Sequence, residues 1–190
     1  MLSKNLKCIN KILSLNHKRM KKISLSIILI WIGFLAFGQK GFKPTSFFTI
    51  LGEVKSPVTV TSDDLKKWKA LDIGNVVITN HLGETKNESK GLKGVLLKDI
   101  LSSIEINSES PKVLSEYYFV CKANDGDTVI YSWNELFNTA TGDSAYIVTE
   151  KEGKPASAMD DSILMISPKD FKTGRRHVKA LTTIEVRRAK

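Results

Sequence analysis

A short basic segment near the C-terminus holds the residues best suited to bind an anion. In the stretch GRRHVK, Gly174 is followed by Arg176, His177 and Lys179. A glycine turn lets backbone N–H groups approach an anion. The arginine guanidinium offers a planar fork for phosphate, and lysine adds a point charge. We therefore take Arg176, His177 and Lys179 as candidate binding residues; the alternative is a solvated basic loop before an edge strand.

A second polar pair follows a short apolar stretch at 76–79. Asn80 and His81 stand where this stretch ends. A histidine can ligate a metal, but a lone histidine at a strand end is more often a surface or hydrogen-bonded residue. The chain has 3 histidines, and they show neither zinc-ligand spacing nor a pairing with a nucleophile. We assign no catalytic residue and no metal ligand, and keep Asn80 and His81 as candidate cofactor-binding residues.

A β-rich domain must position these residues. Runs of β-branched and aromatic residues predict about eight short strands, and apolar residues at helical spacing predict two or three short helices. The strands are expected at 47–54, 58–60, 76–79, 117–122, 128–132, 145–150, 162–167 and 178–187, with helices beginning near 63, 95 and 133. The stretch between residues 80 and 94 is predicted to be a polar loop, and Asp125-Gly126 a hairpin turn. The fold class is therefore α+β: a mixed, β-rich single domain, not a parallel doubly wound sheet.

The first 38 residues are predicted to be an export leader. Residues 23–37 carry no charge. This stretch is too short for a membrane span, which needs about 20 residues, but its length suits the apolar part of a secretory signal peptide. Two lysines precede this stretch and small residues end it. Met20 is an alternative start, and an uncleaved anchor is the alternative to cleavage. We expect a leader at 1–38, a folded domain at 39–190 and a periplasmic or secreted location, with membrane contact only through the leader.

The excess of basic charge belongs to this leader. The whole chain has a formal net charge of +9. The part after residue 38 keeps 22 of the 29 basic residues and all 20 acidic ones, so it offers no case for a nucleic-acid partner. This part contains one cysteine, Cys121, which excludes an intramolecular disulfide. Its apolar neighbours favour a buried structural thiol over a reactive one.

Three segments, taken in order, resemble one protein family. They are LGEVKSPVTVTSDDL at 51–65, KGVLLKDIL at 93–101 and SPKDFKTGRRHVKALTTIEV at 167–186. Each motif alone is weak, but their order and spacing resemble the molybdopterin-binding domain of the sulfite oxidase family, over roughly residues 47–188. The resemblance implies a single sulfite-oxidase-like domain holding one molybdenum through a pterin dithiolene, and oxygen-atom transfer or sulfoxide reduction.

The resemblance also implies where the cofactor would bind. The family's one protein ligand to the metal is a cysteine thiolate, a soft ligand suited to it, from the loop before the Gly-Val-x-Leu element. In this chain that position falls among residues 79–83, which include Asn80 and His81 but no cysteine. The segment 174–179 is similar to the family's basic segment near the pterin and its phosphate, which carries the role over to Arg176, His177 and Lys179.

Two functions remain open from the sequence. The first is an exported molybdopterin-binding-domain protein with a cleft between 80–83 and 174–179 that binds a pterin cofactor or a small anion, or that has lost the cofactor. If active, it would be a molybdenum-dependent oxidoreductase, although the missing cysteine argues against conventional catalysis. The alternative is a non-enzymatic periplasmic module that reuses the fold to bind a ligand or a protein.

Overall fold

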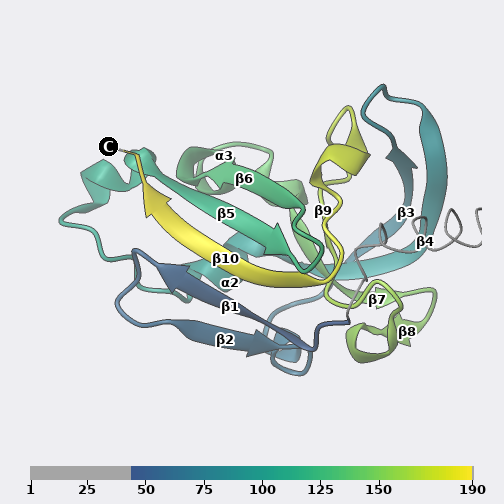
Figure 1. The fold of residues 1–190 in the computed structure, drawn as a ribbon, viewed down its shortest axis with the longest axis horizontal. Coiled ribbons are helices and arrows are strands. Elements are labelled where there is room, and N and C mark those ends of the chain that lie inside the picture. The colour runs from purple at the N-terminus through teal and green to yellow at the C-terminus, as the bar shows by residue number, and fades with distance from the viewer. Residues whose placement is uncertain (1–43, 190) are drawn as a thin grey trace, which may run out of the picture. The chain divides into compact units, whose positions relative to one another are not determined.

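The computed structural model describes residues 44–189, which form two β-sheets with short helices at their edges (Figure 1). The predicted leader at 1–38 and the alternative start at Met20 lie outside the described residues. Within the described part, no helix is long and apolar enough to span a membrane.

The first sheet has the strand order β2-β1-β10-β5-β6. Its strands are β1 (Phe47–Gly52), β2 (Val58–Thr61), β5 (Tyr117–Ala123), β6 (Thr128–Ser132) and β10 (Leu181–Arg188). β1 and β10 run parallel and the other neighbours run antiparallel. Buried residues alternate along β1, where Phe48 and Ile50 are fully buried, because successive strand side chains point to opposite faces.

The second sheet is built around a long hairpin. Its order is β3-β4-β7-β8, with β9 also paired to β7. The strands are β3 (Leu71–Thr79), β4 (Thr85–Leu96), β7 (Tyr146–Lys151), β8 (Lys154–Pro155) and β9 (Met165–Ile166). In Figure 1 the ends of β3 and β4 project beside the loop that follows β9. This places residues about 95 positions apart in sequence next to one another, as the backbone contacts below show.

Short helices complete the described part. The α-helices are α2 (Leu97–Ser102) and α3 (Trp133–Phe137), and the 3₁₀ helices are η2 (Asp64–Lys67), η3 (Pro111–Glu116), η4 (Gly142–Ser144), η5 (Ala156–Ala158) and η6 (Thr173–Arg176). α3 begins with a capping box: the Ser132 hydroxyl accepts from the Glu135 backbone, and the Glu135 carboxylate accepts from the Ser132 backbone. Such reciprocal bonds satisfy N–H groups that a helix start leaves free.

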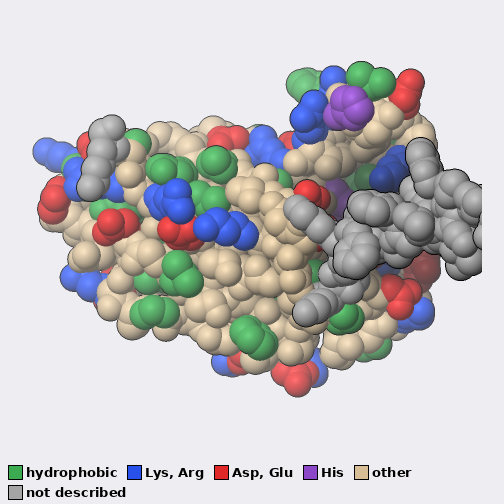
Figure 2. Space-filling model, in the orientation of Figure 1, with side chains coloured by type: hydrophobic (Ala, Val, Ile, Leu, Met, Phe, Trp, Pro, Cys, Tyr) green, Lys and Arg blue, Asp and Glu red, His purple; other side chains and the backbone are tan. Residues whose placement is uncertain are grey.

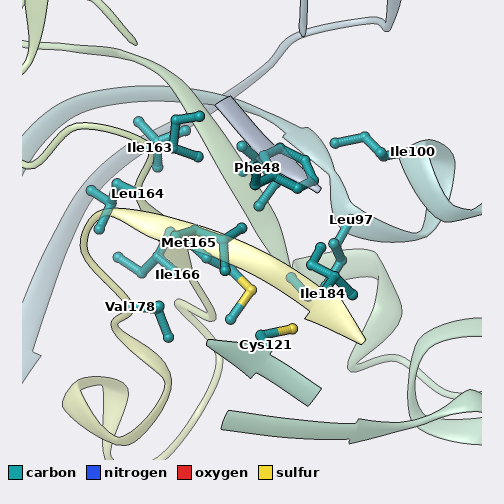
Figure 3. Packing of buried hydrophobic residues seen from close by; sticks show 14 of the residues in the cluster. Phe48, Leu97, Ile100, Cys121, Ile163, Leu164, Met165, Ile166, Val178 and Ile184 are labelled. Carbon is teal, nitrogen blue, oxygen red and sulfur yellow. The ribbon is translucent and has the colours of Figure 1, made fainter. Parts of the chain in front are cut away.

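The core lies between the sheets and takes residues from both. Figure 3 shows Cys121 among buried apolar side chains. Cys121 on β5 stands opposite Ile184 on β10, and both are fully buried. Met165 on β9, also fully buried, comes from the second sheet. The predicted α+β, β-rich fold class is confirmed.

The predicted loop at 80–94 is wrong. Only residues 80–84 turn, and the chain then runs as β4 between β3 and β7. The start of β4, Thr85–Glu88, is exposed and polar, so the residues carry little strand preference of their own. Pairing with β3 on one side and, further along, with β7 on the other fixes the strand conformation, and such tertiary context overrides propensity.

Other boundaries also differ from the sequence expectation. β1 ends at Gly52, not at 54, and β3 begins at Leu71, not at 76. α2 begins at Leu97, not at 95, because the preceding residues continue β4. The strand expected at 162–167 is reduced to β9, Met165–Ile166. The last strand begins at Leu181, not at 178, because Ala180 has a φ of 49°, outside the β region.

Candidate functional site

A cleft of about 370 Å³ opens between the end of the β3–β4 hairpin, the β5–β6 turn and the η6 segment. Figure 2 shows hydrophobic, basic and histidine side chains gathered on the lobe that the hairpin end and the η6 segment form. The residues that line the cleft are Ile78, Thr79, Asn80, His81, Lys86, Asp125, Asp127, Gly174, Arg175, His177 and Lys179. Four of the five candidate residues predicted from the sequence therefore share one cleft: Asn80, His81, His177 and Lys179.

Backbone contacts hold η6 against the end of β3. The Thr173 hydroxyl donates to the Val77 carbonyl at 2.6 Å and accepts from the Thr79 N–H at 3.0 Å. A Cβ on Gly174 would lie 1.8 Å from the Thr79 carbonyl oxygen. Glycine is therefore required at 174 by the close approach of two backbones. The floor of the cleft is built on this junction.

Asn80 shapes the hairpin turn. Its Oδ1 accepts from the Leu82 and Glu84 backbones at 2.9 and 3.0 Å, and its Nδ2 donates to the Glu84 carboxylate at 2.7 Å. Asparagine side chains commonly accept hydrogen bonds from nearby backbone N–H groups in turns. The side chain thus positions the rim of the cleft.

His81 is exposed at the tip of the same turn. Its backbone carbonyl accepts a bond from the Lys172 ammonium at 3.0 Å, which ties the hairpin tip to the segment before η6. No hydrogen bond orients the imidazole within residues 44–189, so it is free to reach a molecule in the cleft.

Lys179 reaches the cleft with its charge already compensated. Its ammonium lies 2.5 Å from Asp161, whose side chain is 8% exposed, and Lys151 pairs with the other carboxylate oxygen. Burial alone would raise the pKa of Asp161, but the hydrogen bonds from Lys151 and Lys179 outweigh it and lower the pKa. Lys179 is consequently a weaker anion partner than an unpaired lysine would be.

Two buried polar atoms at the cleft have no hydrogen-bond partner among residues 44–189. They are Thr79 Oγ1 and His177 Nε2. Burial, together with the nearby Lys179, lowers the pKa of His177 to about 4, although Asp161 acts in the opposite direction. The imidazole is therefore neutral at neutral pH. Buried polar groups normally find a partner, so these two atoms mark an unsatisfied position in the wall of the cleft.

Arg176 does not line the cleft. Its guanidinium lies over the Tyr131 ring, 4.6 Å from the centroid, with Nε 3.0 Å from Asp170 and an Nη atom 3.3 Å from Glu135. The Tyr131 hydroxyl in turn bonds Ser167 at 2.6 Å. Arg176 thus anchors the segment that carries the cleft residues, and the neighbouring Arg175 faces the cleft in its place.

Four charged lining residues were missed by the sequence analysis: Lys86, Arg175, Asp125 and Asp127. Arg175 belongs to the GRRHVK stretch, and it lines the cleft where Arg176 does not. Lys86 required β4 to be recognised as a strand. None of the four forms a salt bridge within residues 44–189.

Solved structures with the same fold exist. One is the sulfane dehydrogenase SoxCD from Paracoccus pantotrophus, with a TM-score of 0.53 and 12% identity over 74% of this chain. The present fold resembles that enzyme. The chain spans 37% of the length of that neighbour. No protein-family model and no curated protein sequence matches the chain, so the likeness is one of fold.

The cleft residues suit the phosphate-bearing organic part of a molybdopterin cofactor but lack the thiolate that would hold its metal. The described cleft residues include no thiol, and within residues 44–189 no group of three or more His, Cys, Asp or Glu side chains could hold a metal ion. Cys121 lies in the core, away from the cleft lining. Lys86 and Arg175, which form no ion pair within residues 44–189, do suit a phosphate. The residues therefore fit the organic anion and do not fit a thiolate-held metal.

Cys121 should be inert in the native protein. Complete burial raises the pKa of its thiol to about 12, and the thiolate is the reactive form. In a Cys8→Ser background, we expect a chromogenic aromatic disulfide at pH 8 to label Cys121 at least about a hundredfold faster in denaturant than in buffer, since labelling requires opening of the core. Equal rates in the two solvents would contradict the buried position.

Proposed function

We propose that this chain is an exported, small relative of the sulfite-oxidase-type molybdopterin-binding domains. Its cleft binds a phosphate-bearing molecule of the pterin-cofactor class, or a related small anion, without a cysteine-held metal. The fold likeness to a sulfane dehydrogenase supports the family assignment, and the uncharged stretch at 23–37 supports export. Metal-centred turnover is no part of this proposal, because the cleft lacks the thiolate.

The observation that carries the proposal is a pair of cations at one cleft that form no ion pair within residues 44–189. Lys86 comes from β4 and Arg175 from η6, so two separate elements present positive charge to the same space. Thr79 Oγ1 and His177 Nε2 lie buried beside them without partners. Charge-assisted bonds to phosphate are about twice as strong as neutral ones, and a neutral imidazole adds a bond without adding charge.

The non-enzymatic module that binds a protein has less support from the cleft. A protein partner would need a contact face of roughly 800 Å² per partner, whereas the unpaired groups converge on one small cleft of about 370 Å³. The size of this cleft is that of a small-molecule site.

Calorimetric titration with inorganic phosphate tests the proposal. Replacing Lys86 and Arg175 together with alanine should weaken phosphate binding at least about tenfold, because each charge-assisted bond contributes about 1.5–3 kcal/mol. A matched variant, Lys55→Ala with Lys112→Ala, removes the same charge at exposed positions outside the cleft. The two variants should differ; equal affinities in both would refute the assignment.

Purification from a host that makes the cofactor gives an independent measurement. Fluorescence of released pterin and elemental analysis for molybdenum should be run on the same sample. We expect pterin without stoichiometric molybdenum. Stoichiometric molybdenum would contradict the conclusion that the cleft does not hold the metal.

A further inference from the structure

The lining of the cleft also carries two acids that form no ion pair within residues 44–189. Asp125 and Asp127 flank Gly126 in the β5–β6 turn, and both line the cleft. The turn is fixed: Ala123 donates to the Asp127 carbonyl at 2.8 Å, and Gly126 has a φ of 95°. The Asp127 N–H donates to one Asp125 oxygen at 3.0 Å. The remaining carboxylate oxygens form no ion pair within residues 44–189 and are available as acceptors.

Charges of both signs therefore face one cleft without neutralising each other. Elsewhere in the described part, strands and loops bring such groups into contact: Lys93 lies 2.8 Å from Glu150 and Lys98 lies 2.5 Å from Asp143. Lys86 and Arg175 line the same cleft as the two acids and still lie beyond ion-pair distance from them. The cleft holds these groups apart and leaves space between them.

This arrangement suits a ligand that carries both a negative and a positive group better than it suits a simple anion. A ligand with negative charge alone would gain from the two cations but would be repelled by the two carboxylates that line the same cleft. A ligand with a cation at its other end would be attracted by both pairs of groups. Thr79 and His177 also line the cleft, and their uncharged Oγ1 and Nε2 atoms have no hydrogen-bond partner within residues 44–189.

We infer that the cleft binds a small dipolar molecule, with a phosphate or carboxylate at Lys86 and Arg175 and an ammonium group or an N–H-rich edge at Asp125 and Asp127. This inference rests on the proposed function for the anionic end and adds the identity of the other end. It makes the β5–β6 turn a specificity element, because its carboxylates discriminate between ligands that carry the same phosphate.

Three soluble probes separate the two ends. Inorganic phosphate reports the anion site alone, ethyl phosphate adds the two-carbon chain, and O-phosphoethanolamine adds the ammonium group to that chain. In calorimetry on the full chain at low ionic strength, O-phosphoethanolamine should bind at least about tenfold more tightly than ethyl phosphate, because its ammonium group meets two unpaired carboxylates.

The Asp125→Asn, Asp127→Asn double variant gives responses of opposite sign. It should weaken O-phosphoethanolamine binding about tenfold and strengthen ethyl phosphate binding, since the repulsive charge is gone while asparagine keeps the turn. The matched control is Glu53→Gln with Glu105→Gln, which removes the same charge from exposed positions outside the cleft. The control should leave the preference between the two ligands intact.

The outcomes distinguish this inference from the proposed function. Equal affinity for ethyl phosphate and O-phosphoethanolamine in the unmodified chain would overturn the dipolar ligand and leave the anion site standing. Phosphate binding unchanged by the Lys86 and Arg175 substitutions would overturn the anion site. A preference for O-phosphoethanolamine that the Asp125 and Asp127 substitutions abolish would support the inference.

Discussion

Gly174→Ala is expected to destabilise the domain by about 3 kcal/mol and to disrupt the cleft, because the new methyl group would overlap backbone. Its Cβ would lie 1.8 Å from the Thr79 carbonyl oxygen. Neither side can move easily, since the Thr173 hydroxyl bonds both the Val77 carbonyl and the Thr79 N–H. Relief of the overlap requires η6 to separate from β3, which moves Arg175 and His177 away from the hairpin.

Urea unfolding of the variant and the unmodified chain measures the loss. Gly153→Ala is the matched control, since Gly153 has a φ of 77° and no atom within 4 Å of the position that a Cβ would take. That substitution adds backbone strain without overlap and should cost about 1–2 kcal/mol. If Gly174→Ala costs no more than Gly153→Ala, the close packing of η6 on β3 is not maintained in solution.

Gly174 also shows how far the sequence could lead. The basic stretch after it draws attention to this segment, and from the sequence its glycine is expected to let backbone N–H groups approach an anion. The structure shows a second reason, the contact with β3, which depends on a strand about 95 residues earlier in the chain. Sequence patterns report local preference, and a contact between distant segments leaves no local signal.

The strands were predictable where their residues carry strand preference. The β5–β6 hairpin follows from YYFVCKA and TVIYS on either side of Asp125-Gly126, because apolar and β-branched runs beside Asp-Gly favour a hairpin. The start of β4 was not predictable, since its residues are polar and exposed. That error hid Lys86, which faces the cleft because its strand pairs with β3.

The sequence does not determine which charged residues line the cleft. The sequence does not distinguish the adjacent Arg175 and Arg176. In the structure Arg175 lines the cleft, whereas Arg176 lies over the Tyr131 ring. Asp125-Gly126 predicts the turn between β5 and β6, as the structure has it. That Asp125 and Asp127 also line the cleft follows from where the sheet topology places this turn, and not from the turn sequence.

The second large effect is a loss of stability as pH falls from about 6.5 to 4, caused by His177. Burial, reinforced by Lys179, Lys151 and Lys86 and opposed by Asp161, lowers the pKa of His177 to about 4 in the folded protein. The unfolded chain binds a proton near pH 6.5, so it holds more protons than the folded state across this window. Unfolding is favoured as pH falls through it, and the contribution reaches about 3 kcal/mol at pH 4.

Replacing His177 with Gln should remove this part of the pH dependence, because an amide does not titrate. The free energy of unfolding, measured by urea at a series of pH values, should then change by about 3 kcal/mol less between pH 6.5 and 4 in the variant than in the unmodified chain. His81→Ala is the control: its imidazole is exposed, and its removal should leave the slope as it was. A slope retained in His177→Gln would mean that the imidazole is hydrated. A slope reduced only in His177→Gln would mean that the His177 imidazole is buried and neutral in the folded protein.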